Sequence, residues 1–268
     1  MKLSIEISSL CNHKCYFCTS NDTSSIIMST DKFKKIIDDI EINKIYIQEL
    51  ILTPSEGEVF MDDEFLIKLE YASNCINIKS IAFHTNFTNV EENDIIKLKE
   101  LQNKKSIQVL ISEYGATVDE FLTLTKTNPR YKYFYKLQEN KQLAIKHQLI
   151  HRIDYRGINY PFIYKKEDHP ITYTGICSNQ YSLRILVNGD VACCICSGSA
   201  SNTDSDLIIG NIFQIPTIVY FLTHSKRKEL YKMHINKQLP EYCKTCATFN
   251  SEKLICNLNV LRYLTKEK

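Results

Sequence analysis

The chain has 268 residues, of which 44% are hydrophobic, and a net charge of +2 at pH 7. This composition supports a sizeable buried core, and the small net charge gives no general attraction toward nucleic acid or membranes. The sequence has no apolar run long enough to span a membrane and no secretory signal, so we expect a cytoplasmic protein. Eleven cysteines in such a chain indicate metal binding rather than disulfides.

The first part of the chain alternates strand-like and helix-like segments, which favours an α/β fold with a parallel sheet and crossover helices. Near residue 155 this periodicity ends. The sequence therefore predicts two domains, over residues 1–155 and 156–268. The expected strands span residues 3–7, 44–52, 78–84, 106–112 and 148–153, and the expected helices span residues 31–41, 62–73, 91–101, 118–125 and 131–146.

A compact cysteine loop follows the first predicted strand. Cys11, Cys15 and Cys18 have the spacing C-x3-C-x2-C. Three thiolates can bind three irons of a cubane cluster and leave the fourth iron open to a ligand that is not protein. A structural zinc site would need a fourth ligand nearby, and the local candidate, His13, lies awkwardly inside the loop.

The carboxyl-terminal part holds a second set of cysteines. Residues 177–194 indicate a β-hairpin with Asn188-Gly189 as its turn. This hairpin would bring Cys177 close to Cys193 and Cys194. A C-x2-C pair lies further along the chain, and a zinc ribbon is one interpretation of the whole set.

The first cysteine loop resembles that of the radical S-adenosylmethionine (AdoMet) superfamily. Members carry C-x3-C-x-aromatic-C after the first barrel strand, and here the aromatic residue is Phe17. The resemblance implies an incomplete (β/α)6 TIM-like barrel with AdoMet bound to the open iron of a [4Fe-4S] cluster. In that superfamily, the reduced cluster cleaves AdoMet to a 5′-deoxyadenosyl radical, which abstracts hydrogen from the substrate.

Further residues at the ends of predicted strands resemble the AdoMet contacts of this superfamily. Gly57 and Glu58 loosely match a Gly-Gly-Glu-Pro motif after the second strand, and Asn86 follows the third strand. Ser112 and Arg152 occupy places where relatives bond AdoMet. Each has a structural alternative: Asn86 as a turn cap, Ser112 as a partner for backbone and Arg152 as a surface charge.

The second cysteine set resembles the twitch domain, a small α+β unit that is a shortened SPASM domain and holds an auxiliary [4Fe-4S] cluster. In relatives, Pro often stands where this chain has Cys193, one residue before the expected ligand Cys194. An alignment in which Cys193 is the ligand instead remains open. Cys256 lies too far along for the full SPASM pattern, which favours one auxiliary cluster. The ligands that the resemblance implies are Cys177, Cys194, Cys243 and Cys246.

The resemblance implies one of two reactions. The first is a two-electron oxidation of a small sugar-like or other polar metabolite, and the second is modification of a ribosomal peptide by epimerisation or cross-linking. Because the predicted barrel begins at Lys2, we expect no fused leader-recognition domain, which favours the metabolite. An epimerase needs a hydrogen-atom donor, for which Cys196 is the candidate.

The expected partners are the substrate and a one-electron reductant such as flavodoxin or ferredoxin. The basic and aromatic residues at positions 130–136 indicate an amphipathic helix rather than a surface for single-stranded nucleic acid, so we expect no nucleic-acid partner. Because the sequence has no apolar span, we also expect no membrane partner. A hypothesis from another class is a non-catalytic zinc-ribbon binding protein. Iron–sulfur clusters would colour the purified protein brown, whereas zinc would leave it colourless.

Overall fold

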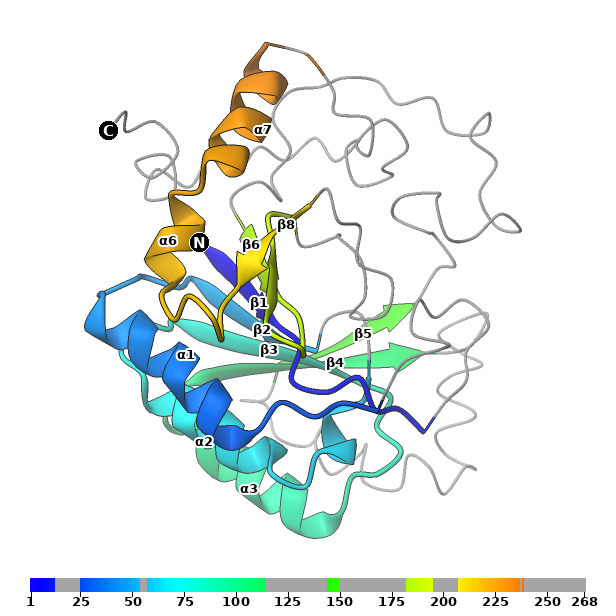
Figure 1. The fold of residues 1–268 in the computed structure, drawn as a ribbon. Helices are drawn as coiled ribbons and strands as arrows, with labels where there is room; N and C mark the ends of the chain where they lie inside the picture. Colours follow the sequence, from blue (N-terminus) through cyan, green and yellow to red (C-terminus); the bar gives the residue numbers. More distant parts are fainter. Residues whose placement is uncertain are drawn as a thin grey trace, which may run out of the picture.

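The structure is a computed structural model. It describes residues 1–12, 25–53, 57–113, 144–149, 182–194, 207–236 and 238. Within these residues the chain has a mixed α/β fold in which helices pack on a central sheet (Figure 1). No helix in this described part is long and apolar enough to cross a membrane.

An eight-stranded sheet forms the centre of the described part. Its strands are β1 (Lys2–Ile5), β2 (Glu49–Leu52), β3 (Ser80–Thr85), β4 (Ser106–Glu113), β5 (Ala144–Leu149), β6 (Ser182–Ile185), β7 (Asp190–Ala192) and β8 (Ile208–Asn211). Their order is β5-β4-β3-β2-β1-β6-β7-β8. Neighbours from β5 to β6 pair in parallel, and β7 and β8 extend the sheet by antiparallel pairing.

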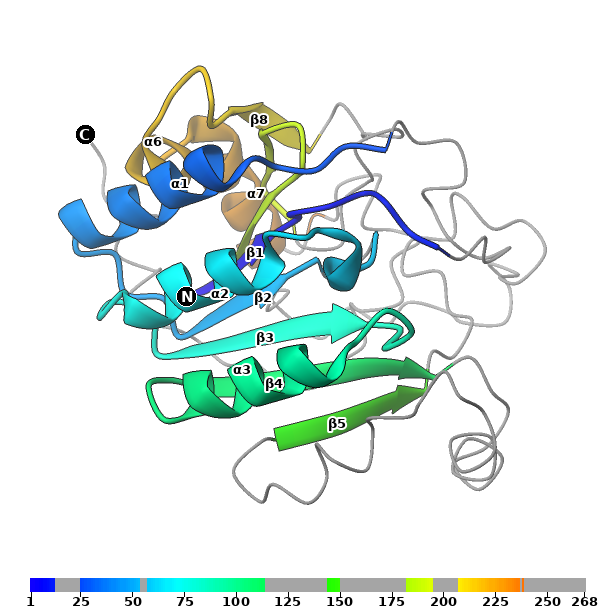
Figure 2. The same ribbon diagram turned by 90° about the horizontal axis from the view of Figure 1, so that it is seen from below.

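Three helices cover one face of this sheet (Figure 2). They are α1 (Thr30–Ile42), α2 (Phe65–Asn74) and α3 (Glu92–Gln102), with a short 3-10 helix η1 (Val59–Met61) before α2. Two further helices, α6 (Ile218–Leu222) and α7 (Ser225–Ile235), follow β8.

Local sequence signals define where the helices begin. The hydroxyl of Ser29 accepts from the backbone N–H of Lys32 and caps α1, and Glu91 and Asp94 form a capping box at α3. These bonds satisfy backbone donors that the first turn of a helix leaves unpaired. At α6, the carboxylate of Asp39 on α1 accepts from the backbone N–H of Ile218 at 2.6 Å, which ties this helix to α1.

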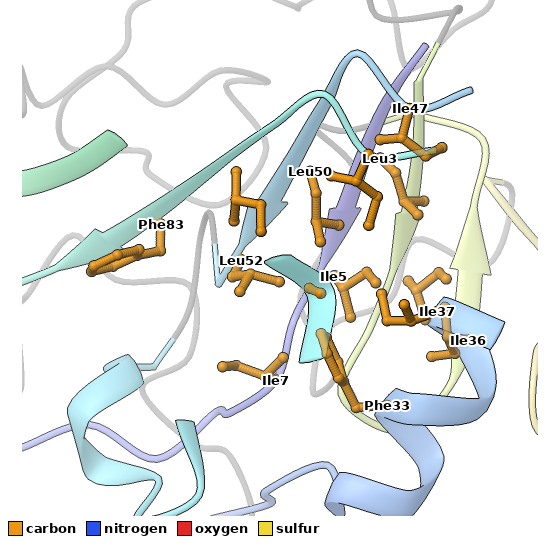
Figure 3. Packing of buried hydrophobic residues seen from close by; sticks show 14 of the residues in the cluster. Leu3, Ile5, Ile7, Phe33, Ile36, Ile37, Ile47, Leu50, Leu52 and Phe83 are labelled. Atoms are coloured by element: carbon orange, nitrogen blue, oxygen red, sulfur yellow. The ribbon is translucent and has the colours of Figure 1, made fainter. Parts of the chain in front are cut away.

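The hydrophobic core lies between the sheet and the three covering helices. Leu3 and Ile5 of β1, and Ile7 just beyond it, point toward Phe33 and Ile37 of α1 (Figure 3). All five side chains are almost fully buried. Successive residues of a strand point to opposite faces, so the residues between these apolar side chains face away from the helices.

The predicted alternation is confirmed for the first four strands and the first three helices, with ends shifted by a few residues. The largest such shift is at β2, which begins five residues later than expected. One prediction is wrong: residues 144–146, placed at the end of a helix, belong to β5. Parallel pairing with β4 from Gln108↔Ala144 to Glu113↔Leu149 overrides the local helical pattern. The predicted helix over 118–125 lies outside the described residues.

The predicted carboxyl-terminal hairpin is confirmed for residues 182–192, and Cys177, at its predicted start, lies outside the described residues. β6 and β7 pair antiparallel on either side of Gly189, whose φ of +90° suits the turn. β6 also pairs with β1, from Lys2↔Ser182 to Ile5↔Ile185, so the hairpin continues the sheet of the first part. The division into two domains, the incomplete barrel and the twitch domain remain predictions.

Candidate active site

Most of the predicted site residues in the described part lie where parallel strands end. Cys11 follows β1, Gly57 and Glu58 follow β2, and Asn86 directly follows β3. Ser112 is the penultimate residue of β4, and its side chain is outside the described part. Because these four strands run parallel, their carboxyl ends meet at one edge of the sheet, which is where α/β proteins bind ligands.

A close backbone contact joins the turn after β2 to the chain after β1. Gly57 has a φ of +74°, and a Cβ atom there would lie 2.1 Å from the carbonyl oxygen of Ser8. The next backbone N–H, of Glu58, donates to the carbonyl of Leu10 at 2.8 Å. Glycine is therefore required by the approach of this turn to the start of the cysteine loop.

The carboxylate of Glu58 is buried and fixes the end of β3. One oxygen, Oε1, accepts from the hydroxyl of Thr85 at 2.6 Å and from the N–H of Phe60 at 3.2 Å. The other, Oε2, accepts from the N–H of Asn86. Glu58 is 1% exposed. The resemblance assigns this carboxylate to the AdoMet amine, and in the structure both of its oxygens accept bonds from protein.

Asn86 forms hydrogen bonds to the beginning of the cysteine loop. Its amide Nδ2 donates to Oδ1 of Asn12 at 2.9 Å and to Sγ of Cys11 at 3.9 Å. Nδ2 of Asn12 donates in turn to the hydroxyl of Thr88 at 2.7 Å. These bonds hold the first cysteine of the loop against the segment that follows β3.

The donor chemistry at Cys11 fits an iron–sulfur cluster. Cys11 is partly exposed and lies where the parallel strands end, with an amide donor directed at its sulfur. Hydrogen bonds to ligand sulfurs are part of the environment of such clusters. Cys15, Phe17, Cys18 and Arg152 lie outside the described residues, and those described contain no group of three or more metal-ligating side chains.

A polar patch lies on the sheet face opposite α1–α3. It consists of Ser4, Glu6, His84 and Arg184. Ser4 and Arg184 are register partners on β1 and β6. Glu6 alternates with Ile5 and Ile7, and its Oε1 accepts from the guanidinium of Arg184. His84 alternates with Phe83, which lies on the helix-facing side.

The charges of the polar patch are deeply buried. Glu6 and Arg184 are 1% and 2% exposed. Burial raises the pKa of Glu6, against the opposing effect of the Arg184 charge, and burial lowers the pKa of His84 to about 4. The hydroxyl of Ser4 and the second carboxylate oxygen of Glu6 are buried and have no hydrogen-bond partner among the described residues. Such atoms indicate a place for water or a ligand.

A hydrogen-bonded clasp shapes the carboxyl-terminal hairpin. Nδ2 of Asn211 donates to the carbonyl of Asn188 at 3.1 Å and to the carboxylate of Asp190 at 2.9 Å. A Cβ atom on Gly189 would lie 2.3 Å from the ring of Phe213. Gly189 and Asn211 thus have a structural role, since Gly189 forms the turn that leads toward Cys193 and Cys194 and Asn211 holds that turn by hydrogen bonds.

The two adjacent cysteines differ in their surroundings. Cys193 is 3% exposed and packs in the core, and burial raises the pKa of its thiol to about 12. Cys194 is partly exposed. This difference favours the register in which Cys194 is the ligand. The other proposed ligands, Cys177, Cys243 and Cys246, and the candidate donor Cys196, lie outside the described residues.

Several residues of the candidate site were not predicted from the sequence. Asn12 was missed because a single polar residue in a loop carries no motif. Glu6 and Arg184 had a usable signal, since each is a charged residue that alternates with apolar ones in a strand. Their pairing depended on the placement of β6 beside β1, which local patterns do not specify.

Solved structures with AdoMet bound share this fold. BtrN in complex with AdoMet and 2-DOIA superposes with a TM-score of 0.65, over 94% of both chains at 14% identity. For anSMEcpe with bound AdoMet the TM-score is 0.56 at 16% identity, over 98% of this chain and 96% of that one. For SuiB of Streptococcus suis bound to S-adenosylmethionine the TM-score is 0.51 at 14% identity, over 92% of this chain and 71% of that one.

The chain has the fold of these AdoMet-bound proteins. At such identities the likeness concerns the fold. No protein-family profile and no curated protein matches the sequence.

Proposed function

We propose that this chain is a radical SAM enzyme whose Cys11, Cys15 and Cys18 hold a [4Fe-4S] cluster that binds AdoMet. The observation that carries the proposal is that Gly57, Glu58 and Asn86 contact the start of the cysteine loop. This arrangement occurs in a fold shared with AdoMet-bound enzymes. When bound, such a cluster supplies the electron that converts AdoMet into a hydrogen-abstracting radical.

The residues of the chain itself prepare the site. Gly57 permits the backbone approach, Glu58 fixes the end of β3, and Asn86 positions Cys11. Ser112 and Arg152 are proposed AdoMet contacts, as is Phe17 beside the cysteines. The enzyme receives electrons from a reductant such as flavodoxin or ferredoxin.

We further propose a two-electron oxidation of a small polar metabolite. The polar patch supports this substrate class, because Ser4 and Glu6 present buried oxygens to which a hydroxyl or amino group can donate. A purely apolar substrate would leave these oxygens unpaired, which is unfavourable. The likeness to BtrN, whose structure contains 2-DOIA, is also consistent with a small-molecule substrate.

The sheet topology supports an electron acceptor on the far side of this patch. β1 and β6 run toward the edge that carries Cys11, whereas β7 runs back, and its last residue, Ala192, pairs with Arg184. β7 therefore leads back toward the opposite edge just before Cys194, which supports an auxiliary cluster across the polar patch from Cys11. An auxiliary cluster on Cys177, Cys194, Cys243 and Cys246 would be placed to take the second electron.

A triple variant tests the AdoMet cluster. Replacement of Cys11, Cys15 and Cys18 with Ala should abolish reductant-dependent formation of 5′-deoxyadenosine in anaerobic protein, while iron bound by the second cysteine set remains. Undiminished cleavage in this variant would reject the assignment. A wild-type protein that is colourless and loaded with zinc would instead support the zinc-ribbon hypothesis.

The fate of the substrate hydrogen tests the reaction type. A compound that the enzyme consumes from an anaerobic extract of polar metabolites should, in deuterium oxide, give a product two mass units lighter without solvent deuterium at the reacting carbon. A product of unchanged oxidation level with one solvent deuterium, lost in Cys196→Ala, would show epimerisation with Cys196 as hydrogen donor. Conversion of a ribosomal peptide instead of any small metabolite would overturn the proposed substrate class.

A further inference from the structure

The orientation of the Asn86 amide is fixed by the groups around it. The N–H of Thr88 donates to Oδ1 of Asn86 at 3.0 Å. Because a backbone N–H can only donate, this bond identifies the oxygen end of the amide, and Nδ2 must be the end that faces Asn12 and Cys11. The N–H of Asn86 itself is held by Glu58.

The Asn86 amide therefore directs its two protons to two acceptors. One is Oδ1 of Asn12 at 2.9 Å and the other is Sγ of Cys11 at 3.9 Å. Asn86 is 3% exposed. The donor side of this contact is therefore buried, and its dipole is held in place by protein groups.

A donor directed at a ligand sulfur affects the two oxidation states of a cluster unequally. The reduced cluster carries one more negative charge, part of which resides on its sulfurs. A fixed N–H dipole stabilises that charge and raises the reduction potential. A residue with this effect does not touch AdoMet or the substrate.

We propose that Asn86 is a positioning residue that raises the reduction potential of the cluster on the Cys11 loop through its amide N–H···S bond to Cys11. This inference rests on the proposed function, since it requires that cluster. It gives Asn86 a different role from the AdoMet contact that the resemblance implies.

The variant that tests this role is Asn86→Ser. A serine hydroxyl can accept from the N–H of Thr88 and keep the turn, the backbone bond to Glu58 stays, and the amide donor to Cys11 is lost. Asn86→Leu removes the same donor in a side chain of similar size. Thr88→Val is the matched control. It removes the Thr88 hydroxyl, which bonds to both Asn86 and Asn12, and leaves the Asn86–Cys11 bond in place.

The measurement is a potentiometric titration of the reconstituted full-length protein, followed by the electron paramagnetic resonance signal that changes when AdoMet is added. We expect both Asn86 variants to have the wild-type iron content and a lower potential. The reduction equilibrium should shift by about threefold or more, where tenfold corresponds to about 59 mV for one electron. Thr88→Val should titrate like the wild type.

Two results would overturn this inference and leave the proposed function standing. One is an unchanged potential in both Asn86 variants. The other is an equal shift in Thr88→Val, which would attribute the change in potential to the conformation of the segment after β3 rather than to the Asn86 amide. A wild-type protein without any AdoMet-responsive signal would overturn the proposed function, and this inference with it. The two failures are therefore distinguishable.

Discussion

Replacement of Glu58 by Gln separates a structural role from a role in AdoMet binding. In the structure, the Glu58 carboxylate accepts from the hydroxyl of Thr85 and from the N–H groups of Phe60 and Asn86. Gln has the same size but only one accepting oxygen. If that oxygen stays with Asn86, the new NH2 group faces Thr85 and Phe60. Thr85 can turn its hydroxyl to accept, whereas the N–H of Phe60 cannot.

The expected loss of stability follows from these contacts. A hydrogen bond to a charged group contributes about 1.5–3 kcal/mol, and a buried donor left unpaired costs about 1–3 kcal/mol. Because the two quantities overlap for the same donor, we expect Glu58→Gln to lower the free energy of unfolding by about 2–4 kcal/mol. This would be a large share of the roughly 5–15 kcal/mol that stabilises a typical domain.

The assay is urea unfolding of the cluster-free protein, with AdoMet binding measured on the reconstituted protein. Glu64→Gln is the matched control, since Glu64 is exposed and accepts from the Thr30 hydroxyl at 2.6 Å. Its effect should stay within about 0.5 kcal/mol, as for most surface substitutions. The reasoning would be refuted by an unchanged unfolding midpoint in Glu58→Gln together with weaker AdoMet binding.

Three further predictions follow from the described residues. Cys194→Ser should lower the iron content of the reconstituted protein, whereas Cys193→Ser should mainly destabilise the core; iron loss from Cys193→Ser alone, by elemental analysis, would show that the register is wrong. Gly57→Ala should unfold at lower urea and lose the first cluster, because its Cβ cannot coexist with the backbone of Ser8. For His84, a folded pKa of about 4 lies below the ordinary value of 6.5, so the unfolded state takes up the proton first, and stability falls as pH drops through 6.5 and levels off below 4. Between pH 7 and pH 5 the free energy of unfolding should fall by about 2 kcal/mol because of His84. Urea unfolding at the two pH values should show that this loss is absent in His84→Gln.

Local patterns in the sequence predicted the alternating elements and the hairpin, because periodicity and turn chemistry are local properties. Gly189 illustrates this, since an Asn-Gly turn needs the positive φ that the structure gives it. The position of β5 was missed because it depends on pairing with β4. No property of residues 144–146 alone distinguishes a strand from the end of a helix.

The candidate site divides in the same way. Cys11, Gly57, Glu58 and Asn86 were found because they belong to motifs. Their bonds to one another were not, because a motif names the residues without the partners of each. The pairing of Glu6 with Arg184 was equally out of reach, since 178 positions separate them in the chain.

β1 is the element that connects the parts of the proposed reaction. Its end leads to Cys11, one face packs on α1, and the other face carries Ser4 and Glu6. Its pairing with β6 brings Arg184 to Glu6 and fixes where the hairpin turns back toward Cys194. A register slip of one residue would exchange the two faces of β6 and put Arg184 against the apolar core. The buried pair of Glu6 and Arg184 opposes such a slip, because a charge left without its partner in the interior is strongly unfavourable. The same ion pair that makes the patch polar therefore also holds the register of β6 against β1, on which the position of the hairpin depends.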